Sequence, residues 1–484
     1  MKNPNLKKSV GLALLILLYT VGSAQSAYQI KLVLRPFKNS LVYLGYYYGK
    51  LKAIADSLTL DEQSEGTFQG KTKLAGGIYF VVSPKKEILF EVLIDQQQHF
   101  SIVADSSDSP DRVKFIGSPD NEIFQSYTHY MARQGKAITE AQVKLTSATT
   151  KMDSTALIDQ IKSLNADVLR YREELQKKYP TSILTTMLTA LREPVVPKQP
   201  GGAGAKKDSL FAYRYFKSHY WDGISFTDDR LIRTPFFEPK LDKYYKDLVP
   251  PEPDSMNREV DKMLLDARTN KEMFKYLLVH FTQKYINPEY MGQDAVFVHI
   301  FEKYINTGQA DFFTDKYRKF VNDRAYSLMA NLIGLPAADL QMTDTLEKPS
   351  TLYLVQANFT VVCFWDPTCS HCKESVPKLD SIYQAKWKKE GVKLFGVMVE
   401  GGKENWLKFI RDHNLSGWIH VYQTQAQHDA ETASNKPGFR QMYDVYQTPM
   451  MYLLDKDKRI IAKKLSYQQF DQVIDLKLKQ AKSN

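Results

Sequence analysis

The apolar run Val361-Val362-Cys363-Phe364-Trp365 is followed by Asp366-Pro367-Thr368 and then by Cys369-Ser370-His371-Cys372. The run predicts a buried strand, and the residues behind it predict the start of a helix. A cysteine on the first turn of a helix lies beside unpaired backbone N–H groups and the positive end of the helix dipole, which favour its thiolate. Because the thiolate is the nucleophile of disulfide exchange, a redox-active dithiol is the leading hypothesis for this chain.

Cys369 and Cys372 are two of only 3 cysteines in 484 residues, so the chain is not a disulfide-stapled scaffold. Residues three apart share a helix face, which permits a disulfide without backbone movement. The alternative without a catalytic role is a static disulfide or a pair of small core residues. A zinc site needs about four ligands, and only Cys369, Cys372 and His371 cluster here, so we expect no metal. Covalent haem requires a histidine after the second cysteine, and we expect no cofactor.

The composition is that of a globular protein large enough for two to four domains, with 43% hydrophobic and 25% charged residues. The net charge is +10, or about +7 once the lysines of an expected N-terminal leader are subtracted. The sequence contains no basic stripe with interleaved aromatic residues, which argues against a nucleic-acid partner.

The N-terminus has the pattern of a secretion signal. Basic residues precede the uncharged stretch from Val10 to Val21, and small residues follow at Gly22-Ser23-Ala24. We expect residues 1–24 to be a signal peptide that is cleaved after Ala24, and we expect the mature protein to reside in the periplasm or cell envelope without a stable membrane span. The alternative is that the apolar stretch is retained as a membrane anchor, although it is short for a bilayer span of about 20 residues.

Residues 28–125 are predicted to form an all-β domain, an antiparallel sandwich or partly open barrel, because short apolar or alternating runs are separated by turn residues. The expected strands are Lys31 to Leu34, Leu41 to Tyr48, Ile78 to Val82, Ile88 to Ile94 and Phe100 to Val103. Residues 126–335 are predicted to be a helical domain, with a long helix or hairpin from about Thr139 to Lys178 and a Pro/Gly-rich loop at 194–207.

Residues 336–484 alternate between strand and helix patterns, which predicts a mixed sheet covered by helices. The expected strands are Leu352 to Val355, Val361 to Trp365, Val392 to Val399, Trp418 to Tyr422, Met450 to Asp455 and Arg459 to Lys464. The expected helices begin near Cys369, Lys403, Gly438 and Tyr467. Asp455-Lys456-Asp457-Lys458 predicts a hairpin turn between the last two strands.

With the motif from Phe364 to Cys372, Pro377 downstream and Thr448-Pro449 before a strand, this region resembles a thioredoxin-fold thiol-disulfide oxidoreductase. It is most similar to the exported branch that contains the cytochrome-maturation reductases. The upstream regions resemble extensions that Gram-negative envelope bacteria fuse to such domains. The resemblance implies that Cys369 attacks and Cys372 resolves the mixed disulfide, with cysteine-containing envelope proteins and an unidentified redox partner as reaction partners.

The same resemblance implies a cis-proline at Pro449 that faces the dithiol, with the backbone of Thr448 open to a substrate segment. His371, between the two cysteines, is expected to tune the redox poise, because a protonated imidazole stabilises a nearby thiolate. An exposed histidine of little influence and an ordinary trans proline are the alternatives.

Two positions of this sequence depart from the pattern of the thioredoxin-fold oxidoreductases. Thioredoxins carry a buried acid six positions before the first catalytic cysteine, and Cys363 stands there. The cytochrome-maturation relatives place a glutamate three positions after the second cysteine, and Ser375 stands there, beside Glu374. The proton acceptor for Cys372 is therefore left open among Glu374, Glu400 and water.

The leading hypothesis is an exported thiol-disulfide oxidoreductase. A second hypothesis is a thioredoxin-fold peroxidase, although its usual pattern places threonine and proline farther ahead of the cysteine. A third hypothesis is a partner-binding envelope protein that uses the thioredoxin-like domain as a scaffold.

Overall fold

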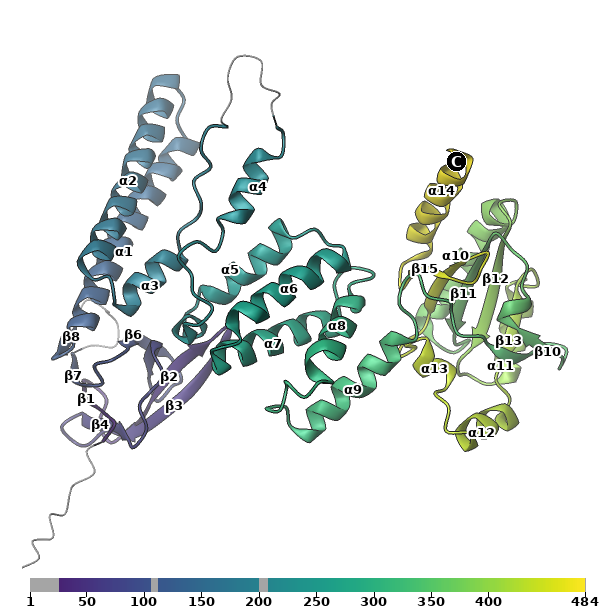
Figure 1. Cartoon of the computed structure of the whole chain (residues 1–484), viewed down its shortest axis with the longest axis horizontal. Helices are drawn as coiled ribbons and strands as arrows, with labels where there is room; N and C mark the ends of the chain where they lie inside the picture. Colours follow the sequence, from purple (N-terminus) through teal and green to yellow (C-terminus); the bar gives the residue numbers. More distant parts are fainter. Residues whose placement is uncertain (1–25, 106–111, 200–207, 484) are drawn as a thin grey trace, which may run out of the picture. The chain divides into compact units, whose positions relative to one another are not determined.

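The computed structural model describes residues 26–105, 112–199 and 208–483 (Figure 1). The predicted signal peptide and residues 200–207 of the predicted loop lie outside these ranges. The chain divides into two compact units, each described here by itself. One runs to Ile224 and includes Asp229–Lys240, and the other comprises Ser225–Asp228 and the chain from Leu241 onward. Within the described ranges, no helix combines the length and the apolarity needed to cross a membrane.

The first unit begins with a sandwich of two four-stranded sheets, in the orders β4-β1-β7-β8 and β3-β2-β5-β6. Its core takes side chains from both sheets, including Ile30 and Ile102 from one and Leu44 and Val81 from the other. The strands are β1 (Tyr28–Leu34), β2 (Leu41–Tyr48), β3 (Leu51–Thr59), β4 (Glu65–Gly70), β5 (Gly77–Val82), β6 (Ile88–Ile94), β7 (His99–Ala104) and β8 (Val113–Ile116).

The predicted all-β unit is confirmed, but its purely antiparallel character is wrong. Strands β1 and β7 pair in parallel, because the strands between them belong largely to the other sheet and no hairpin fixes their relative direction. Strands β3, β4 and β8 were not among the expected strands. Most side chains of β3 are exposed, so it lacks the apolar alternation that marks a half-buried strand.

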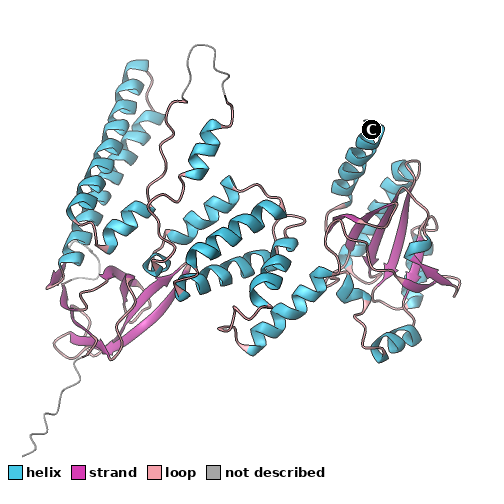
Figure 2. Ribbon diagram, viewed as in Figure 1, coloured by secondary structure: helices cyan, strands magenta, loops and turns pink. Residues whose placement is uncertain are grey.

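Helices follow the sandwich (Figure 2). The predicted helix or hairpin up to Lys178 is a hairpin of two long helices, and the side chain of Thr150 caps the second by accepting a hydrogen bond from the Asp153 amide. The helices of this part are α1 (Pro119–Thr146), α2 (Lys151–Lys178), α3 (Ile183–Ala190), α4 (Phe211–Ser218), the 3-10 turn η2 (Asp229–Arg233) and α5 (Phe237–Lys243).

The second unit contains the remaining helices and a seven-stranded sheet, ordered β10-β9-β13-β12-β11-β14-β15. Its helical part consists of the π-helical turn η3 (Tyr244–Leu248), α6 (Pro253–Ala267), α7 (Lys271–Ile286), α8 (Asp294–Ile300), the π-helical turn η4 (Phe301–Ile305) and α9 (Asp315–Met329). The strands are β9 (Gln341–Asp344), β10 (Pro349–Thr351), β11 (Phe359–Trp365), β12 (Val392–Met398), β13 (Ile419–Tyr422), β14 (Met450–Asp455) and β15 (Ile460–Lys463). The helical elements along the sheet are η5 (Leu352–Leu354), α10 (Ser370–Ile382), η6 (Tyr383–Trp387), α11 (Lys403–Asp412), α12 (Gln425–Ala433), α13 (Phe439–Met442) and α14 (Tyr467–Ser483).

Strand β11 is the centre of this sheet and is buried along its whole length. It pairs in parallel with β12 and antiparallel with β14. Val361, Cys363 and Trp365 point into the core on one face, and Val362 and Phe364 point into the core on the other. A strand covered on both faces is a continuous apolar run, which is why the sequence identified it.

The predicted class of the C-terminal region, an α/β sheet with helices on its faces, is confirmed. The strand predicted at Leu352 to Val355 is wrong, because Leu352 to Leu354 form a 3-10 turn. Leu352 is buried, whereas the side chains of Tyr353 and Leu354 are exposed, so the apolar letters there do not mark a pleated strand. Strands β9 and β10 and helix α12 were not predicted.

Candidate functional site

The end of β11 leads directly into the helix that carries the dithiol. The Asp366 carboxylate accepts hydrogen bonds from both the amide and the hydroxyl of Thr368, each at 2.7 Å. The amide of Cys369 donates to the carbonyl of Asp366 at 3.2 Å, and Cys369 becomes the N-cap residue of α10. A short polar turn thus places Cys369 at a helix start, as predicted.

The sulfur of Cys369 is partly exposed and its pKa is lowered. The main cause is a hydrogen bond from the backbone N–H of Cys372, with further contributions from the Thr448 side chain and the backbone of His371. These donors outweigh the opposing effect of desolvation. Cys369 therefore holds its thiolate at lower pH than an ordinary cysteine, which is the property that a nucleophilic cysteine requires.

Cys372 lies one helical turn deeper and is fully buried. Burial raises the pKa of its thiol to about 12, although the Asp366 amide donates to this sulfur at 3.5 Å. All three cysteines are free thiols, so the structure represents the reduced dithiol. The two thiols of the pair differ in the way that an attacking and a resolving cysteine require.

Thr448 and Pro449 lie beside this dithiol, and the peptide bond between them is cis, as predicted. The Cys369 thiol donates a hydrogen bond to the Thr448 carbonyl at 3.5 Å. Next to this contact is a small cavity of about 100 Å³, lined among others by Asp366, Glu400, Arg440, Tyr446, Gln447 and Thr448. Most of this lining is polar, and it includes Thr448, whose carbonyl contacts the Cys369 sulfur.

His371 is exposed on the first turn of α10, near Glu374, whose pKa it helps to lower. Its expected influence on the redox poise stays a prediction. Cys363 is buried in the same core cluster as Cys372, and burial raises the pKa of its thiol. It has the environment of an inert core residue.

The structure does not assign the role of proton acceptor for Cys372 to either Glu374 or Glu400. Glu374 is exposed and pairs with Lys378 at 2.6 Å, and this hydrogen bond lowers its pKa. Glu400 accepts a hydrogen bond from Arg440, also at 2.6 Å. Both carboxylates are engaged by cations and are not among the groups that shift the Cys372 pKa.

Gly401 supports the site and was missed in the sequence. Its φ is +93°, and a Cβ at this position would lie 2.4 Å from the Asp366 carboxylate and 2.8 Å from Pro367. The close approach therefore requires glycine. The Gly401-Gly402 pair, which follows the predicted strand Val392 to Val399 after one residue, was the available signal. In the described ranges, no group of three or more His, Cys, Asp or Glu residues forms a metal site.

Comparison with known families agrees with this geometry. Residues 333–463 match the model of the AhpC/TSA family, and residues 171–328 match a domain of unknown function, DUF5106. No curated protein matches the chain.

Several solved structures are similar to the chain. A domain of a possible thiol-disulfide isomerase from Cytophaga hutchinsonii is 36% identical and covers 32% of this chain and 97% of its own, with a TM-score of 0.28. A thioredoxin-like protein from Bacteroides caccae is 17% identical and covers 59% of this chain and 98% of its own, with a TM-score of 0.44. The thioredoxin domain of a thiol-disulfide oxidoreductase from Bacteroides vulgatus is 24% identical and covers 29% of this chain and 97% of its own, with a TM-score of 0.26.

The strand, the helix-start dithiol and the AhpC/TSA match define the C-terminal region as a thioredoxin-like domain. At 36% identity over 97% of a solved domain, family membership follows. The chain belongs to the thioredoxin-like thiol-disulfide oxidoreductases, with additional domains ahead of the redox domain.

Proposed function

We propose that this protein is an exported enzyme that exchanges disulfides with cysteines of other cell-envelope proteins through Cys369 and Cys372. One observation carries the proposal: a partly exposed sulfur with a lowered pKa at the start of α10 has a fully buried thiol one turn behind it. This arrangement favours attack by the first sulfur and delays the second until the first is occupied.

In the reducing direction, the Cys369 thiolate attacks one sulfur of a partner's disulfide. A mixed disulfide forms, and the partner's other sulfur leaves as a thiolate. Cys372 then gives its proton to water, and its sulfur attacks Cys369. The Cys369–Cys372 disulfide forms, and the partner's second sulfur leaves as a thiolate. Two electrons pass from the enzyme to the partner, and the two departing thiolates take up protons from solvent.

Regeneration of the dithiol requires a second redox partner, for which an exported dithiol protein has the appropriate chemistry. The sulfurs carry both electrons, so the reaction uses no cofactor. The same steps run in reverse when the enzyme begins as the disulfide and oxidises a partner. His371 between the two cysteines favours the thiolate form and therefore the oxidising direction, whereas the resemblance to cytochrome-maturation reductases favours the reducing one.

Export to the periplasm or cell envelope is supported by the sequence of residues 1–24, in which basic residues precede an uncharged stretch and small residues. In that compartment a dithiol enzyme meets oxidised protein partners. Cell fractionation tests this part: the mature protein should appear in the periplasmic fraction without its leader.

Turnover of insulin disulfides with dithiothreitol as reductant tests the activity. Cys369→Ser should abolish catalysis, because it removes the attacking sulfur. Cys372→Ser should accumulate a mixed disulfide with the partner on Cys369, because nothing resolves it. Cys363→Ser is the matched control, since Cys363 is buried and inert, and it should retain turnover. Undiminished activity in Cys369→Ser would refute the proposal.

Two further measurements separate the alternatives. A peroxidase would form stoichiometric sulfenic acid on Cys369 with dilute peroxide and resolve it through Cys372. A scaffold protein would still bind its partners when both Cys369 and Cys372 are replaced by serine. The proposed enzyme would no longer form a mixed disulfide with its partners in that double variant.

A further inference from the structure

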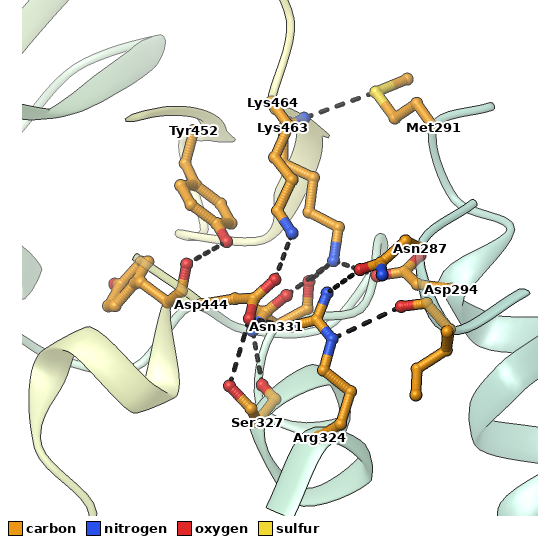
Figure 3. Close-up of polar contacts among 12 residues, drawn as sticks. Asn287, Met291, Asp294, Arg324, Ser327, Asn331, Asp444, Tyr452, Lys463 and Lys464 are labelled. Atoms are coloured by element: carbon orange, nitrogen blue, oxygen red, sulfur yellow. Dashed lines mark hydrogen bonds and ion pairs between the residues drawn. The ribbon is translucent and has the colours of Figure 1, made fainter. Parts of the chain in front are cut away.

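Helix α9 contacts the chain segment that leads to the redox site. This segment, residues 441–448, runs from the end of α13 to Thr448, whose carbonyl contacts Cys369. Both α9 and the segment belong to the second unit. Figure 3 shows Arg324, Ser327 and Asn331 from the helical part together with Asp444 from the segment.

Two of these contacts hold the end of α13. The Ser327 hydroxyl of α9 donates to the carbonyl of Gln441 at 2.7 Å, and the side-chain amide of Asn331 donates to the carbonyl of Met442 at 2.9 Å. The last carbonyls of a helix have no partner within the helix. The Gln441 carbonyl also accepts from the backbone N–H of Asp444 at 3.2 Å, so Ser327 is an additional donor there. Residues outside the redox domain therefore add side-chain hydrogen bonds to the end of α13.

Asp444 is the turning point of the segment. Its φ is +52°, a left-handed conformation that few residues other than glycine, asparagine and aspartate adopt. Its carboxylate is buried and forms ion pairs with Arg324 of α9 and with Lys464 after β15. A buried carboxylate is stable only when it is paired, so these two cations fix the turn.

Arg324 contacts the segment on both sides of Val445. Its guanidinium pairs with Asp444 and also lies 5.6 Å from the ring centre of Tyr446. The guanidinium is itself held by the Asn287 side chain at 3.3 Å and the Ile286 carbonyl at 3.4 Å, both at the end of α7. Tyr446 and Thr448 line the cavity beside the dithiol. One side chain thus connects the helical part to the wall of the redox site.

We propose that Arg324 is a positioning residue of the redox site, which fixes residues 444–448 so that Thr448 stays against Cys369. The helical part that ends in α9 would then be a working component of the enzyme. The measurement of disulfide exchange rests on the proposed function. The second measurement, the reactivity of Cys369 toward a small reagent, is independent of it.

Loss of Arg324 should act on Cys369 only through the segment. The titratable neighbours of Cys369 are Cys372 and His371 on α10 and Asp366 in the preceding turn, and Arg324 is not among the groups that shift its pKa. Thr448, at the end of the segment, is among them: its side chain lowers the pKa of Cys369, so displacement of Thr448 should raise that pKa. A changed pH profile of Cys369 in an Arg324 variant would therefore report movement of Thr448.

The test compares Arg324→Met with Lys319→Met in the full chain. Lys319 lies on the same helix, where it forms an exposed pair with Asp323. We measure iodoacetamide labelling of Cys369 against pH, and kcat/KM for insulin reduction. Arg324→Met should move the labelling midpoint to higher pH and lower kcat/KM about fivefold, as expected for a coupling of about 1 kcal/mol. Lys319→Met should change neither, and Arg324→Lys, which can still pair with Asp444, should restore most of both.

A folded Arg324→Met protein with the wild-type labelling midpoint would overturn the proposal. If that variant does not fold, Ser327→Ala replaces it, because it removes one hydrogen bond to Gln441 and should shift the midpoint in the same direction by a smaller amount. An unchanged midpoint in Ser327→Ala would then be the contradicting result. Wild-type protein without exchange activity would refute the proposed function, and the midpoint comparison would still decide the role of Arg324.

Discussion

The sulfur of Cys369 lies 3.5 Å from the carbonyl oxygen of Thr448, which is 79 residues further along the chain. One partner is placed by the start of α10, and the other by the loop before β14. Strand β14 pairs directly with β11, the strand that leads to the dithiol, so the sheet brings the two ends together. The reactivity of the sulfur consequently depends on local and distant parts of the chain.

The first prediction concerns selective labelling. Because the pKa of Cys369 is lowered while that of Cys372 is raised to about 12, the first thiol ionises at a pH at which the second remains protonated. Iodoacetamide at pH 7 should add one group per chain, on Cys369, as measured by mass spectrometry. The rate should rise with pH and reach its plateau below the pH required by an ordinary cysteine. Unfolding in guanidinium is the control, in which all three cysteines should react alike. Equal labelling of Cys369 and Cys372 in the folded protein would contradict the assignment.

The second prediction compares two adjacent glycines. Gly401 and Gly402 both have positive φ, at +93° and +82°, but only a Cβ on Gly401 would meet Asp366 and Pro367. Alanine at either position should cost about 1 kcal/mol of backbone strain. Gly401→Ala should in addition displace the turn before Cys369 and slow disulfide exchange about tenfold, because small misplacements of reacting groups are costly. Gly402→Ala should keep the wild-type exchange rate. Similar exchange rates in the two variants would show that the Asp366 turn does not depend on the close approach of Gly401.

The third prediction is a pH dependence of stability. Burial lowers the pKa of His420 to about 4, and its Nε2 donates to the Leu415 carbonyl at 2.8 Å. At pH 7 the imidazole is neutral in the folded state. The pKa of His420 is about 6.5 in the unfolded chain and about 4 in the folded chain. Between these two pH values, His420 is protonated in the unfolded chain but neutral in the folded chain. The stabilisation is therefore complete above pH 6.5 and is lost as the pH falls toward 4.

His420→Gln tests this sign, because the amide can still donate to Leu415 but cannot titrate. Between pH 7 and pH 5, the wild type should lose about 2 kcal/mol more free energy of unfolding than the variant. Urea unfolding followed by tryptophan fluorescence is suitable, since Trp365, Trp387, Trp406 and Trp418 all lie in one core of the redox domain. Parallel pH profiles of the two proteins would contradict a neutral buried histidine.

The fourth prediction concerns the C-terminal helix α14. Asp471 accepts hydrogen bonds from the Trp387 indole at 2.8 Å and from Lys386 at 2.7 Å, whereas Asp475 forms an ion pair with Lys386 at 2.7 Å. Trp387 is fully buried, so Asp471→Ala leaves a buried donor without a partner and should cost about 1–3 kcal/mol. Asp475→Ala removes a more exposed ion pair and should cost less than about 1 kcal/mol. Equal losses in urea unfolding would mean that the indole contact contributes little.

Much of the redox domain was predictable because its signals are local. Strand β11 contains the unbroken apolar run from Val361 to Trp365, and β14 was predicted with its observed bounds, Met450 to Asp455. The failures occurred where a strand lies at a sheet edge or on a polar surface. Strands β9 and β10 are short, and most of their side chains are exposed or half-buried, so their sequences carry no periodicity. From Leu352 to Val355 the apolar residues were present, but the chain turns there, and the two middle side chains are exposed while the two outer ones are buried.

For the site, the sequence alone determined the identity of the dithiol, its position at a helix start and the proline at 449, since spacing along one strand and one helix is a property of neighbouring residues. The tertiary structure decided which thiol is buried, which carbonyl contacts the reactive sulfur, and that Asp444 pairs with Arg324. Burial and ion pairing depend on residues more than a hundred positions apart, as in Arg324 and Asp444, and distances of that kind exist only after the chain has folded.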